Sequence, residues 1–157
     1  MIVVVMGVSG AGKTTIGRLL AARLGVRYIE GDDYHPSSNV AKMAGGVALD
    51  DEDRWPWLAR LNQVLREEKS AVLACSALKE SYRERLLSEI PHARIVHLHG
   101  DKALIASRLA GRRHRYMPAS LLDSQLAALE PPEAAIVLDV SADPGECVEA
   151  IVRELAA

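Results

Sequence analysis

The chain has 157 residues and a formal net charge of −2, and 25% of its residues are charged while 49% are hydrophobic. This balance is typical of one globular domain over residues 1–157, and it gives no general attraction to nucleic acid or to an anionic membrane. No apolar stretch approaches the roughly 20 residues that span a bilayer, and the short apolar start lacks a basic leader, so the sequence predicts a cytoplasmic protein with neither partner.

Short β-branched runs alternate with longer amphipathic stretches along the chain. Strands are expected over 2–6, 26–30, 71–75, 93–99 and 134–140, and helices over 13–24, 53–68, 79–89, 101–110, 119–129 and 144–155. Several strands are continuously apolar, which predicts an α/β fold with a five-stranded parallel sheet and helices on both faces. Pro56 is tolerated only in a first turn, so its helix is expected to begin near Arg54, capped by the acidic run 50–53.

The segment GVSGAGKT, residues 7–14, matches the pattern G-x-x-x-x-G-K-[ST] between a predicted strand and a predicted helix. Glycines let the backbone curl so that its N–H groups point at a phosphate, and the helix N-terminus adds positive potential. Lys13 is expected to bridge the β- and γ-phosphates of ATP, and the Thr14 hydroxyl to ligate Mg²⁺. The predicted nucleotide-binding residues are Gly7, Ser9, Gly10, Ala11, Gly12, Lys13, Thr14 and Thr15.

A P-loop alone leaves two classes open, a nucleotide-hydrolysing switch or motor and a kinase that acts on a small molecule. The chain has no N-K-x-D motif for guanine, and no carboxylate follows its third strand, which continues as Cys75-Ser76-Ala77. It is also too short for a separate effector module. These absences favour a compact kinase.

The segments EGDDYHP (30–36) and CSALK (75–79) follow the second and third strands, so they are expected to meet the P-loop at one edge of the sheet. Together the blocks GVSGAGKTT, GDDYHPSSNVAKMAGGVALDDEDRWPWL, CSALKESYRERL and MPASLLDSQLAALEPP resemble the P-loop gluconokinases of the GntK type, over most of the chain.

The resemblance implies a P-loop kinase fold with a helical lid, ATP-dependent phosphorylation of D-gluconate to 6-phospho-D-gluconate, Mg²⁺ dependence and often a homodimer. Two other interpretations remain open from the residues. One is a kinase for another small sugar acid or polyol, and the other is a regulatory protein that binds or hydrolyses ATP.

Phosphorylation of a hydroxyl needs a group that orients it and accepts its proton. Asp32 lies opposite the P-loop, where related small-molecule kinases place such a carboxylate, and it is the predicted catalytic base; the alternative is a turn aspartate bonded to its own backbone. Glu30 is expected to reach Mg²⁺ through water. Asp33 is expected to point away, because neighbouring side chains diverge in extended chain.

The carboxylate of a sugar acid is best held by a forked arginine. Arg54 is the first candidate and Arg83 the second, and a surface ion pair is the alternative for each. His35, Ser76 and Lys79 complete the predicted substrate-binding set, although His35 also suits a loop or capping position.

The basic segment GRRHRYM, residues 111–117, lies between two predicted helices. We interpret it as part of a lid, roughly residues 111–129, that closes arginines over the ATP phosphates and excludes water. Arg112 is the predicted catalytic arginine, and Arg108 and Arg115 are the next candidates. The lid departs from the family pattern R-x-G-H-F, because His114 replaces the glycine and Arg115 the histidine.

Overall fold

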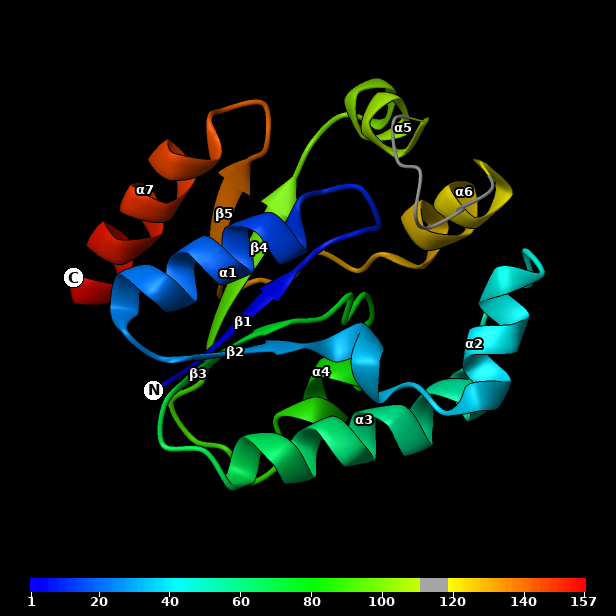
Figure 1. Ribbon diagram of the computed structural model, residues 1–157, viewed down its shortest axis with the longest axis horizontal. Helices are drawn as coiled ribbons and strands as arrows, with labels where there is room; N and C mark the ends of the chain where they lie inside the picture. The colour runs from blue at the N-terminus through cyan, green and yellow to red at the C-terminus, as the bar shows by residue number, and fades with distance from the viewer. Residues whose placement is uncertain (111–118) are drawn as a thin grey trace.

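A five-stranded parallel sheet forms the centre of the protein, in the order β2-β3-β1-β4-β5 (Figure 1). The computed structural model describes residues 1–110 and 119–157. The strands are β1 (Ile2–Met6), β2 (Arg27–Glu30), β3 (Ala71–Ala74), β4 (Arg94–His99) and β5 (Ile136–Asp139). Every residue of β1 and β3 is buried, as expected for strands covered on both faces, and the predicted α/β fold is confirmed.

Helices cover both faces of this sheet. The helices in the described part of the chain are α1 (Lys13–Leu24), α2 (Ser37–Ala44), α3 (Asp51–Arg66), α4 (Glu80–Leu86), α5 (Lys102–Ala110), α6 (Ala119–Ala128) and α7 (Pro144–Ala156). Figure 1 shows α1 and α7 on one face, α3 and α4 on the other, and α2, α5 and α6 beyond the carboxyl ends of the strands. Of the helices described, none is long and apolar enough to cross a membrane.

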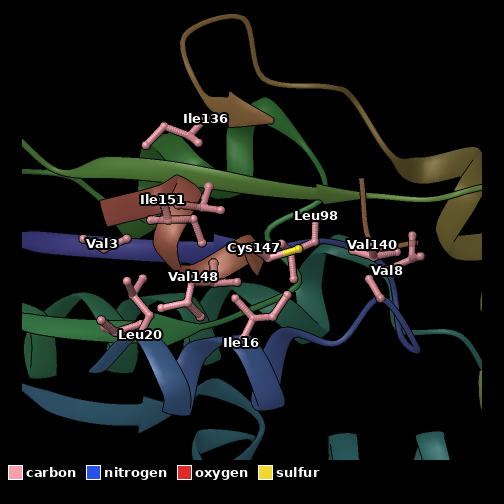
Figure 2. Packing of buried hydrophobic residues seen from close by; sticks show 14 of the residues in the cluster. Val3, Val8, Ile16, Leu20, Leu98, Ile136, Val140, Cys147, Val148 and Ile151 are labelled. Carbon is pink, nitrogen blue, oxygen red and sulfur yellow. The ribbon is translucent and has the colours of Figure 1, made fainter. Parts of the chain in front are cut away.

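The face under α1 and α7 is packed with aliphatic side chains (Figure 2). Ile16 and Leu20 of α1 meet Val148 and Ile151 of α7 over Val3 of the central strand, and all five are buried. Burial of each such side chain stabilises the fold by about 1.5–3 kcal/mol. The packing fixes α1 against β1, and therefore fixes the P-loop that joins them.

Helix α3 begins at Asp51, so the prediction of a start near Arg54 is wrong. A capping box sets the true start, because the Asp50 carboxylate accepts from the Asp53 N–H at 2.8 Å and the Asp53 carboxylate accepts from the Asp50 N–H at 3.0 Å. The predicted capping role of this acidic run is confirmed. Pro56 consequently lies inside the helix, beyond its first turn.

Two short elements after β2 were not predicted. A 3-10 helix, η1 (Gly31–Tyr34), follows the strand directly, and α2 comes next. The backbone at Asp33 is therefore helical and not extended, so the divergence of neighbouring side chains in extended chain does not explain where Asp33 points. Within α2 only Asn39 is buried, so the apolar side chains of this helix do not pack into the core.

Candidate active site

The P-loop curls tightly between β1 and α1. Gly10 and Gly12 have φ angles of 87° and 97°, in the left-handed region that favours glycine. A Cβ on Gly10 would lie 2.8 Å from Leu109 Cγ, whereas the space beside Gly12 is open. The curl brings backbone N–H groups and the N-terminus of α1 to one point, which is the arrangement that binds a phosphate.

A cluster of oxygen atoms lies beside the first turn of α1. The Thr14 hydroxyl donates to Glu30 Oε2 at 2.7 Å, and the Tyr28 hydroxyl donates to the same oxygen at 2.6 Å. Burial, reinforced by Glu30, raises the pKa of Tyr28 well above its usual range, so the phenol remains a hydrogen-bond donor. Hydroxyl and carboxylate oxygens are the ligands that Mg²⁺ prefers, so Thr14 and Glu30 fit such a cation.

A cavity of about 470 Å³ opens beside the P-loop. Its polar side carries Lys13, Asp32, His35, Arg54 and Ser76, which come from the ends of β1, β2 and β3 and from α3. Its other wall is apolar and comes from α2, the segment after α2, and α6: Val40, Met43, Val47, Leu49 and Leu121. Ser9 of the P-loop lines it as well, so the fold brings six of the predicted site residues into one cavity.

Asp32 and His35 lie together at the end of η1. His35 Nε2 is 3.8 Å from Asp32 Oδ1, and the imidazole stacks on Trp57 at 4.0 Å between ring centroids. The His35 side chain is only 3% exposed. Burial lowers the pKa of His35 to about 4, against the opposing effect of Asp32 and together with the charge of Arg54, so the ring is neutral at pH 7.

Arg54 is held in place by neighbours on two sides. Its guanidinium donates to the Leu49 carbonyl and, at 3.3 Å, to the Tyr82 hydroxyl, and it lies 5.1 Å from the centre of the Tyr82 ring. Lys79 Nζ lies 5.5 Å from the centre of the same ring and donates to Asp51 at 3.3 Å. Arg54 therefore faces the cavity, whereas Lys79 is not among the cavity-lining residues.

Arg83 also lies outside the cavity. Its side chain is buried and donates to the carbonyls of Ala77, Leu78 and Glu130 at 2.8, 3.1 and 2.8 Å. Ala77 has a positive φ of 42°, which is uncommon outside glycine. The structure therefore places Arg83 as a clamp on the loop after β3 and not as a side chain that meets a substrate.

Gln125 of α6 contacts the P-loop and was not singled out by sequence analysis. Its Oε1 accepts from the Ser9 backbone N–H at 2.7 Å, and its Nε2 donates to the Ser9 hydroxyl at 3.1 Å. The pair links α6 to the phosphate-binding turn across more than a hundred residues of chain. The sequence pattern held no signal for it, because a glutamine on a helix is ordinarily solvated.

The expected lid arginines are only partly described. Arg108 of α5 donates to the Val140 carbonyl at the end of β5 and does not line the cavity. Arg112, His114 and Arg115 lie outside the residues that the structure describes. Their predicted roles stay predictions.

Comparison with known proteins gives a consistent result. Residues 2–132 match a family model described as an AAA domain. The gluconokinase of Gluconobacter oxydans is 47% identical over 161 residues, which cover 98% of this chain and 90% of that protein. A sugar kinase from Janibacter sp. superposes with a TM-score of 0.93 at 42% identity, over 99% of this chain and 94% of that one. A gluconokinase from Sinorhizobium meliloti superposes with a TM-score of 0.91 at 42% identity, over 98% and 90%.

The clamp made by Arg83 has a measurable consequence for stability. Arg83→Met leaves the buried Ala77 carbonyl without its donor and removes the bond to the Glu130 carbonyl, and we expect the free energy of unfolding to fall by about 3 kcal/mol. Urea denaturation followed by circular dichroism measures it. Arg85→Met is the matched control, because Arg85 is exposed on the same helix, and it is expected to change the value by less than about 0.5 kcal/mol. Equal losses in the two variants would contradict the clamp.

Proposed function

Since this chain belongs to the gluconokinase family, which phosphorylates D-gluconate at the 6-hydroxyl with ATP, we propose how its own residues perform that transfer. The observation that carries the proposal is a single cavity in which the P-loop Lys13 and the carboxylate of Asp32 both take part. A phosphoryl donor and a hydroxyl acceptor bound there meet at one place. Holding two reactants in this way removes much of the entropic barrier to their reaction.

The P-loop side binds the nucleotide. Backbone N–H groups from Gly10 to Lys13 and the start of α1 surround the phosphates, and the Lys13 ammonium neutralises charge on the transferred group. Thr14, through its hydroxyl, and Glu30, through water, would hold Mg²⁺, which would supply charge neutralisation to the phosphates. Tyr28 keeps Glu30 in place by donating to it at 2.6 Å.

Asp32 orients the 6-hydroxyl of gluconate and accepts its proton as the phosphoryl group is transferred. Its place at the end of β2, beside the P-loop, supports this role. Buried His35 is neutral at pH 7, because its pKa is held near 4 mainly by burial. Asp33 is exposed and outside the cavity lining, so we assign it no part in the transfer.

Arg54 pairs with the carboxylate of gluconate. Its guanidinium is fixed by Leu49 and Tyr82 and lines the same cavity as Lys13, so a sugar acid bound there can contact both side chains. Ser76 and His35 line the same cavity and hydrogen-bond the hydroxyls. Lys79 and Arg83 take no direct part in this arrangement.

Further features of the proposal rest on family membership and on sequence. Arg112 closes over the phosphates as part of the lid, and Arg108 and Arg115 support it. The protein acts as a homodimer in the cytoplasm, where it feeds gluconate into carbohydrate metabolism.

A panel of acceptors tests the function directly. ADP release is coupled to NADH oxidation and measured with D-gluconate, other sugar acids, polyols, shikimate and nucleoside monophosphates. We expect D-gluconate to raise the rate far above the acceptor-independent hydrolysis of ATP. Turnover with another acceptor and none with gluconate would overturn the substrate, and hydrolysis that no acceptor accelerates would point to a regulatory ATPase.

Asp32→Asn tests the proposed base. Loss of general-base help should lower kcat by about 10²–10⁴-fold, while the KM for ATP stays near its wild-type value. Steady-state kinetics at saturating gluconate measure both constants. Asp33→Asn is the control, because it makes the same chemical change at the next residue outside the cavity, and it should leave kcat within a factor of two. A near-normal kcat in Asp32→Asn would remove Asp32 from this role.

Arg54→Met tests the carboxylate clamp. Hydrogen bonds to a charged group contribute about 1.5–3 kcal/mol, so the KM for gluconate should rise about 10- to 150-fold with little change in the KM for ATP. The substitution keeps most of the aliphatic stem and removes only the charged end. An unchanged KM for gluconate would place the clamp elsewhere.

A further inference from the structure

Asn39 is a buried polar residue of α2, 1% exposed, to which no role has been given above. Its Nδ2 lies 2.8 Å from the Asp53 backbone oxygen and 3.1 Å from Nδ1 of His35. It therefore connects α2, the start of α3 and the histidine that lines the cavity. A buried amide with two such partners is costly to replace.

The two contacts together decide where the proton of His35 lies. A backbone carbonyl can only accept, so the Asn39 atom that faces Asp53 is the amide nitrogen and donates to it. The same nitrogen faces His35, and it can only donate there as well. Nδ1 of His35 must therefore accept, which leaves the ring proton of the neutral imidazole on Nε2.

Nε2 points toward Asp32 at the cavity, 3.8 Å from its Oδ1, which is too long for a direct hydrogen bond. A hydroxyl oxygen of the acceptor placed beside both atoms donates its proton to Asp32 and accepts from the Nε2–H of His35. We propose that Asn39 is a positioning residue that fixes His35 as a hydrogen-bond donor at the cavity, so that the acceptor hydroxyl is held with its proton directed at Asp32. The role of Asp32 in this step rests on the proposed function.

The surroundings of His35 keep the ring in that state. The charged groups that face it are Asp32 from η1 and Arg54 from α3, whereas α2 presents the uncharged Asn39. Burial dominates and lowers the pKa of His35 to about 4. Trp57 stacks on the ring at an interplanar angle of 16°, which fixes the plane in which the Nε2–H points.

Nitrogen NMR of the imidazole tests the tautomer without any acceptor. Uniformly ¹⁵N-labelled protein gives two-bond ¹H–¹⁵N correlations for each histidine, and the signals missing in His35→Gln belong to His35. Between pH 8 and pH 6 we expect a protonated Nε2 and an unprotonated Nδ1. A protonated Nδ1, or fast exchange between tautomers, would overturn the proposal, whatever the substrate of the enzyme is.

Replacement of Asn39 gives the second measurement. In Asn39→Asp the carboxylate accepts from the ring, so the Nδ1 signal should shift to its protonated position. In Asn39→Leu kcat should fall about 10- to 100-fold, as is common when a reacting group is slightly misplaced. If neither variant folds, the wild-type spectrum still decides the tautomer. A kcat within a factor of two in folded Asn39→Leu, measured with whichever acceptor the panel identifies, would overturn the positioning role.

Two controls distinguish loss of the proposed positioning role from the general effect of removing a buried amide. Asn62 of α3 is buried and donates to the carbonyls of Leu86 and Ser88 at 2.8 Å each, away from the cavity. Asn62→Leu should therefore lower stability and leave kcat near the wild-type value. A Gln side chain places a donor near the position of Nε2, whereas Asn does not reach it, so His35→Gln should retain more activity than His35→Asn. The reverse order would contradict a donor at Nε2.

Discussion

The curl of the P-loop between β1 and α1 is the constraint on which the rest of the site depends. Gly10 and Gly12 adopt left-handed backbone angles there, and Leu109 leaves no room for a side chain on Gly10. The core under α1 and α7 holds both ends of the turn (Figure 2). Because β2 and β3 run parallel to β1, their carboxyl ends deliver Asp32 and Ser76 to the same edge.

The hydrogen-bond partners of a charged side chain decide its place in the site as much as its residue type does. Arg54 and Arg83 both lie on helices that cover the same face of the sheet. Arg83 donates its hydrogen bonds to backbone carbonyls, whereas Arg54 lines the cavity. Glu30 and Asp32 are two residues apart, and they too differ in what surrounds their carboxylates. Glu30 accepts from Thr14 and Tyr28, and Asp32 lines the cavity.

Much of this arrangement could be predicted from sequence, because continuous apolar runs and the P-loop pattern depend on local spacing. The start of α3 could not, since the rule for Pro56 was weaker than the capping box of Asp50 and Asp53. Helix α2 could not either, because its eight residues are fewer than the roughly 11–18 over which hydrophobic periodicity is read. The contact of Gln125 with Ser9 depends on tertiary structure alone, and no periodicity reports it.

Helix α2 shows how one part of the cavity lining is held. Hydrophobic packing does little for it, since Val40 is half exposed and Asn39 is its buried residue. Directional bonds hold it instead: Lys42 pairs with the Asp53 carboxylate at 2.8 Å, and Asn39 bonds the Asp53 backbone. A hydrophobic contact tolerates sliding, whereas these bonds fix a register. Asp53, which helps to cap α3, therefore also positions the α2 lining of the cavity, so the geometry of this lining follows from hydrogen bonds rather than from the core.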